Sequence, residues 1–128
     1  MSHFGNVPAE TLVDAVEKHV AKMDETELAS VLRGGIASMN DNARSAFVSS
    51  IFDAFRDRGE SSEDAAEGAN APLAALESGD QKALAALLDY AKENTGVLKE
   101  AMTIYAEQHT DHINSLPRPL LDAIAARL

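Results

Sequence analysis

The sequence predicts an all-α fold, a compact bundle of six to eight short amphipathic helices with no sheet. Three observations support this prediction. Apolar residues recur at three- and four-residue steps in successive segments, which is the spacing of one helix face. Capping and turn residues separate these segments. No run alternates apolar and polar residues as a strand does, and no Asn-Gly or Asp-Gly pair marks a hairpin.

The first half of the chain contains three expected helices. Pro8 suits the opening turn of the first. Asp24 is the expected N-cap of the second, and Glu27 completes a capping-box pattern. The third follows the turn at residues 40–42. Their apolar faces are formed by Leu12, Val13, Val16, Val20 and Met23, by Leu28, Val31, Leu32, Ile36 and Met39, and by Phe47, Val48, Ile51, Phe52 and Phe55.

Two details of this half matter for packing. Gly34 and Gly35 interrupt the second helix, and each glycine costs a helix interior roughly 1 kcal/mol relative to alanine. Either the helix ends there, or another backbone packs closely against Gly35, which lies on the apolar side. The third helix carries three of the four phenylalanines and is therefore expected at the centre of the core.

The second half continues the same pattern. Pro72 begins a short helical turn, and Asp80 caps the next helix. Residues 94–96 end that helix, and a further helix follows. Residues 116–119 are expected to be extended, because a residue that precedes proline avoids the helical region. The apolar positions are Leu73 and Leu76, then Leu84, Leu87, Leu88 and Ala91, then Leu98, Met102, Tyr105, His109 and Ile113, and finally Leu120, Leu121, Ile124 and Leu128.

An acidic, polar connection at residues 59–71 lies between these two helical halves. It contains four acidic residues and no basic residue, so it is either an exposed linker or a short polar helix begun by Ser62. A chain of 128 residues fits one domain of ordinary size, and we expect a single helical domain over residues 1–128.

Composition and charge exclude several classes of function. The absence of cysteine rules out disulfides, thiolate zinc sites, iron–sulfur clusters and a cysteine nucleophile. The net charge is −10 and the basic residues are scattered singly, which disfavours nucleic acid and anionic membranes as partners. No segment resembles a signal peptide or reaches the length of a membrane span, so the expected location is cytoplasmic.

His109 and His112 are the candidate metal ligands. On a continuous helix, residues three apart share a face, so both imidazoles could meet one ion. A third ligand would have to come from elsewhere in the chain, with Glu93, Glu100 or His19 as candidates. The favoured alternative is that His109 is a partly buried histidine and His112 a polar residue near a helix C-terminus. No cofactor is expected.

Tyr90 is the candidate interface residue. It lies off the main apolar stripe of its helix, so it either anchors a protein interface or covers the acidic connection. No phosphate-binding loop, nucleophile elbow or metalloprotease motif is present, and we expect no catalytic residue.

The sequence therefore favours a non-enzymatic protein that acts by protein–protein contact, either with itself as a homo-oligomer or as a small regulatory partner of another protein. The alternative is a small-molecule or metal-binding bundle that uses His109 and His112. In that case the pocket would lie between the helix around Phe47–Phe55 and the helix around Leu98–Ile113, with His109 and Tyr105 as its polar groups.

Overall fold

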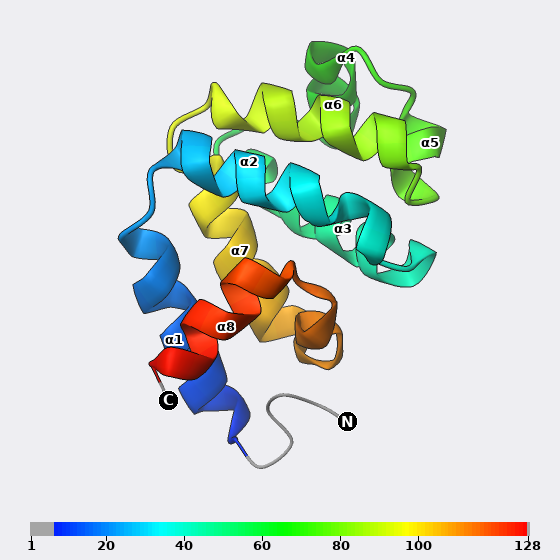
Figure 1. Ribbon diagram of the computed structural model, residues 1–128. Coiled ribbons are helices and arrows are strands. Elements are labelled where there is room, and N and C mark those ends of the chain that lie inside the picture. Colours follow the sequence, from blue (N-terminus) through cyan, green and yellow to red (C-terminus); the bar gives the residue numbers. More distant parts are fainter. Residues whose placement is uncertain (1–6, 128) are drawn as a thin grey trace.

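The computed structural model describes residues 7–127, which form α-helices and short 3₁₀ helices and contain no strand (Figure 1). The predicted all-α class is confirmed. Leu128, expected on the last apolar face, lies outside the described residues. The helices are α1 (Ala9–Ala21), α2 (Glu25–Gly35), η1 (Ile36–Ser38), α3 (Asp41–Arg56), α4 (Ser62–Ala69), α5 (Leu73–Glu77), α6 (Gln81–Lys92), α7 (Val97–Gln108), η2 (Thr110–Ser115) and α8 (Arg118–Ala126).

Helix α7 lies at the centre of the arrangement. It contacts α1, α2, α3 and α6, and α3 packs along it most extensively. Figure 1 shows α1 and α8 toward one end of the molecule and α4 and α5 toward the other. The three phenylalanines of α3 are buried against this core, as the sequence predicted. Phe47 meets Tyr105 of α7 edge to face, with ring centroids 5.5 Å apart.

Side-chain caps begin several helices where the sequence predicted them. Asp24 accepts a hydrogen bond from the backbone N–H of Thr26, and Asn40 and Asp80 cap α3 and α6 in the same way. Helix α7 begins differently. Its N-cap residue, Gly96, has a φ of +90°, and its N–H donates to the carboxylate of Glu25 at the start of α2. The start of the central helix is thus completed by a distant residue.

Arg44 is a buried cation near the start of α3. Its Nε donates to the carbonyl of Gly79 at 2.6 Å, and Nη1 donates to the carbonyls of Ile36 and Met39. Its Nη2 pairs with Asp41. One side chain therefore connects α3 to η1 and to the turn between α5 and α6, and supplies the donor for the carbonyls of Gly79 and Met39, whereas the Ile36 carbonyl also accepts from the N–H of Met39.

The acidic connection contains helix α4. Ser61 caps it by accepting from the N–H of Asp64 at 3.2 Å. Ala65 and Ala66 are buried, and α4 contacts α3, α5 and α6. Of the two expected forms of this segment, the short polar helix is the one present, and it begins one residue after its Ser61 cap.

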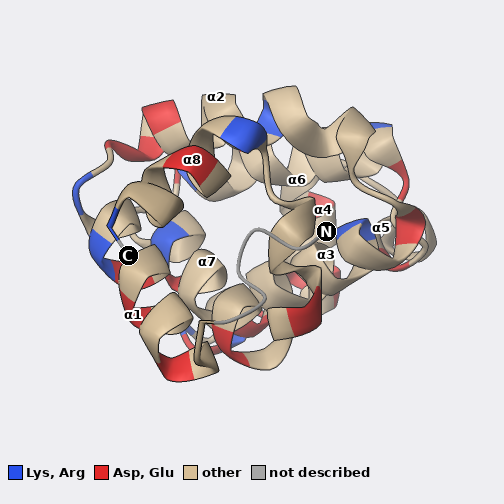
Figure 2. Cartoon of the chain, turned by 60° about the horizontal axis from the view of Figure 1, so that its bottom comes forward, with Lys and Arg blue, Asp and Glu red and all other residues tan. Residues whose placement is uncertain are grey.

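Charged residues are spread over the surface. Asp and Glu lie on helices around the molecule, and Lys and Arg are dispersed among them (Figure 2). Several cations form ion pairs, including Arg33 with Asp89 and Arg58 with Glu100. Over residues 7–127, none of the helices combines the length and the apolar character that crossing a membrane requires.

Candidate functional site

The histidine pair is separated by the end of a helix. The continuous helix expected through Ile113 is wrong, because α7 ends at Gln108 and a 3₁₀ turn follows. The Thr110 hydroxyl donates to the carbonyl of Ala106 at 2.9 Å, and the Tyr105 hydroxyl donates to the carbonyl of His112 at 2.8 Å. These bonds turn the chain back on itself. His109 and His112 therefore do not share one α-helical face.

The rings of His109 and His112 are 6.4 Å apart between centroids. His112 lies 3.7 Å from the Asp111 carboxylate, and His109 lies against the Tyr105 ring. Within residues 7–127, no group of three or more His, Asp or Glu side chains is arranged to hold a metal ion. Of the suggested third ligands, Glu100 pairs with Arg58.

His19, another suggested ligand, has cationic neighbours. Burial and, after it, the charge of Arg127 lower the pKa of His19.

The space between α3 and α7, where a ligand was expected, is occupied by side chains. Tyr105 is fully buried and contacts Phe47, and Met102 and Ile51 are buried as well. Burial, with a smaller contribution from the charge of Asp111, raises the pKa of Tyr105, so this hydroxyl stays protonated as a hydrogen-bond donor. The expected polar group is therefore used in holding the chain after α7.

Tyr90 covers the acidic connection, which is the second of its two expected positions. Its ring stacks on Phe55 with centroids 5.3 Å apart and lies against Gly68 of α4. Its hydroxyl donates to the Glu60 carboxylate at 2.7 Å. This hydrogen bond, followed by burial and by nearby carboxylates, raises the pKa of Tyr90 to about 12. Tyr90 thus fastens α4 to α6 while its side chain stays partly exposed.

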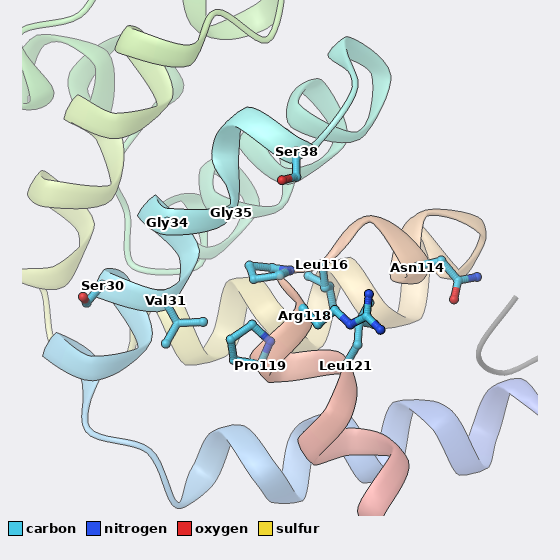
Figure 3. Close-up of a pocket in the computed structure, with 11 residues that line it drawn as sticks. Ser30, Val31, Gly34, Gly35, Ser38, Asn114, Leu116, Arg118, Pro119 and Leu121 are labelled. Atoms are coloured by element: carbon cyan, nitrogen blue, oxygen red, sulfur yellow. The ribbon is translucent and has the colours of Figure 1, made fainter.

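A groove of about 590 Å³ lies between α2 and α8 (Figure 3). One wall follows α2 and η1, and the facing wall is formed by the segment that leads into α8. The lining residues are Ser30, Val31, Gly34, Gly35, Ser38, Asn114, Leu116, Pro117, Arg118, Pro119 and Leu121. Most of the second wall is apolar, and the groove is open to solvent along Ser30, Ser38 and Pro119.

The two neighbouring glycines of α2 behave differently in this groove. A Cβ on Gly35 would lie 2.8 Å from the Cβ of Pro117 and still closer to its Cγ, so glycine is needed for α2 to meet the segment before α8. Both alternatives that the sequence suggested are present, because α2 ends at Gly35 and another segment packs closely against this residue. A Cβ on Gly34 would have nothing within 4 Å, and the backbone there is helical. The fold gives no steric or conformational reason for glycine at 34.

Of the residues within 7–127 that line the groove, Arg118 alone is charged. It is exposed in the first turn of α8, after Pro117. Over residues 7–127 its side chain takes part in no hydrogen bond or ion pair. The sequence pointed to Gly35 as a packing glycine, but it did not indicate the groove or Arg118. The sequence predicted an extended segment over residues 116–119, and this is wrong for Arg118 and Pro119, which form the first turn of α8. The position of Arg118 at the positive end of a helix dipole was therefore not foreseen.

No protein family model, curated protein or solved structure matches this chain.

Proposed function

We propose that this protein is a binding module and that the groove between α2 and α8 receives an apolar segment of a partner protein. The observation that carries the proposal is Gly34. A glycine in this helical position costs about 0.5–1 kcal/mol relative to alanine. Nothing within the described fold compensates for that cost, and the residue faces the groove. Departures from local sequence rules that serve no purpose in folding are expected at functional sites.

The shape of the groove favours a protein segment over a small molecule. Small-ligand sites bury most of the ligand surface, typically about 70–90%. Here exposed residues stand on both sides, Ser30 and Ser38 on one wall and Pro119 on the other. A small ligand would remain largely in water, whereas side chains that project from a larger body would fill the groove and be covered by that body.

The charge of the chain favours a different protein over a second copy. Each copy carries a net charge of −10, and like charge opposes self-association. The apolar faces of the helices are also used within the core, where Leu, Ile, Val, Phe and Met side chains from α1 to α8 are buried.

The test uses random peptides displayed on phage and selected on the immobilised protein. Binding of the selected peptides is then compared among the wild type, Gly34→Leu and Ala74→Leu. The first variant fills the groove. The second adds the same side chain at an exposed position of α5 and serves as the control. We expect Gly34→Leu to weaken binding at least about tenfold, the loss of about 1.4 kcal/mol typical of a key contact, and Ala74→Leu to leave it unchanged.

Three results would overturn the proposal. Selected peptides that bind all three proteins equally would show that the groove is not used. A dimer in sedimentation that Gly34→Leu dissociates would assign the groove to a second copy. A small-molecule mass that accompanies the wild type in native mass spectra and is lost from Gly34→Leu would assign it to a ligand.

A further inference from the structure

Arg118 places an unpaired positive charge beside the apolar wall of the groove. In a chain with 21 acidic and 11 basic residues, carboxylates are plentiful, and Arg33, Arg44, Arg56 and Arg58 each pair with one. Arg127 forms no ion pair over residues 7–127, but it lies at the C-terminal end of α8, where the helix dipole favours a cation. Arg118 pairs with none over residues 7–127, although Asp122 stands one turn further along the same helix. The fold therefore does not account for this cation.

The position of Arg118 in α8 sharpens this conclusion. It occupies the first turn of a nine-residue helix, where the positive end of the helix dipole repels a cation and attracts an anion. The next residue, Pro119, has no N–H, and the N–H of Leu120 already bonds to the carbonyl of Pro117. Neither residue therefore offers a free backbone N–H to an anion, whereas the guanidinium of Arg118 is available as a donor on this side of the groove.

A partner that covers the groove would bury the charge of Arg118, and the anion that compensates for this charge would have to come from the partner. Among the described residues 7–127, the lining of the groove contains no acidic residue. A partner that seals the groove removes water from around the guanidinium, and a cation that loses water without gaining an anion is costly. An occupant that brings a carboxylate turns this cost into a charge-assisted hydrogen bond, and arginine can bind both carboxylate oxygens at once.

We propose that the partner segment combines apolar side chains, which enter the groove, with an Asp or Glu that pairs with Arg118. This inference rests on the proposed function, and it specifies the chemistry of the partner. The net charge of −10 opposes a strongly acidic partner as it opposes a second copy, so we expect a partner of lower negative charge whose carboxylate at Arg118 is a local feature.

The test compares two pools of synthetic peptides that share the same random apolar positions. One pool carries Asp or Glu at a single varied position, and the other carries Asn or Gln there. We expect the acidic pool to bind the wild type at least about tenfold more tightly than the amide pool, because charged hydrogen-bonded pairs at interfaces couple by more than about 1.4 kcal/mol. Arg118→Glu should remove this preference, and added salt should weaken it in the wild type.

Lys82→Glu is the matched control. It makes the same change of charge at an exposed position of α6 where the side chain has no ion pair within the described chain, so it should leave the preference intact. Thermal unfolding verifies that both variants are folded. Two pools that bind equally, with both losing affinity in Gly34→Leu, would overturn the assignment of the carboxylate and leave the proposed function standing. If Gly34→Leu binds both pools as tightly as the wild type does, the proposed function is overturned, and this inference with it.

Discussion

The interface between α3 and α7 differs from the groove between α2 and α8 in how costly residues are compensated. In the interface, the Tyr105 hydroxyl is bonded to the carbonyl of His112, and the buried Ser50 hydroxyl is bonded to the carbonyl of Ala46. In the groove, Gly34 and Arg118 both cost helix stability, and nothing in the described fold compensates for either. The first region is built for stability, and the second departs from what stability alone would select.

The largest loss of stability is expected at Arg44, a buried cation whose desolvation is compensated by hydrogen bonds and an ion pair. Replacing Arg44 by Met would leave the carbonyls of Gly79 and Met39 without their donor, while the Ile36 carbonyl would keep the N–H of Met39. We expect the free energy of unfolding to fall by about 3 kcal/mol, since each unsatisfied buried group costs about 1–3 kcal/mol. Urea denaturation measures the change. Arg56→Met, at an exposed position, is the control. A loss no larger than in the control would contradict the role given to Arg44.

Gly35→Ala tests whether the base of the groove is closely packed. The added methyl group would overlap the ring of Pro117, which cannot rotate away. Overpacking of this kind typically costs about 1–3 kcal/mol, so the midpoint of chemical denaturation should fall. An unchanged midpoint would mean that α2 and the segment before α8 separate easily.

Gly34→Ala, one residue earlier, should have the opposite sign. Its Cβ has nothing within 4 Å and the backbone is helical, so alanine should stabilise the protein by about 0.5–1 kcal/mol. The same denaturation experiment measures it. Together the two variants would show that the fold requires Gly35 but not the adjacent Gly34. Destabilisation by Gly34→Ala would show that the fold does need this glycine.

The smallest effect concerns pH. Burial first, and then the hydrogen bond to Asp57 and its charge, raise the pKa of Glu100, although Arg58 acts in the opposite direction. A raised folded-state pKa contributes stability below the unfolded pKa, and this contribution is lost as the pH rises through the folded-state value. Glu100→Gln should therefore be slightly more stable than the wild type at neutral pH, by less than about 1 kcal/mol for this partly exposed group.

The advantage of Glu100→Gln should disappear near a pH of about 4, where the carboxyl of the wild type is protonated as well. Thermal unfolding across this range measures the difference. Glu67→Gln, on the exposed face of α4, controls for the change in net charge. Equal behaviour of the two variants would assign the effect to general repulsion in an acidic chain.

Local signals account for what the sequence predicted correctly. The Asp24, Asn40 and Asp80 caps act within a few residues of themselves, so the helix starts could be predicted without tertiary structure. The end of α7 could not, because Tyr105 reaches forward to His112 only once the chain has turned. The groove is a property of two helices far apart in sequence. Gly34 and Arg118 line a common groove only when α8 lies beside α2.

The bond from Gly96 to Glu25 has a consequence for how the protein unfolds. The two residues are 71 positions apart, yet the carboxylate of one completes the start of the central helix that follows the other. A fragment that lacked α2 would leave the first turn of α7 without this acceptor. A fragment that lacked α7 would remove the helix against which α1 and α2 pack. Neither half is therefore complete alone, and the chain is expected to unfold in one cooperative transition rather than in separate stages.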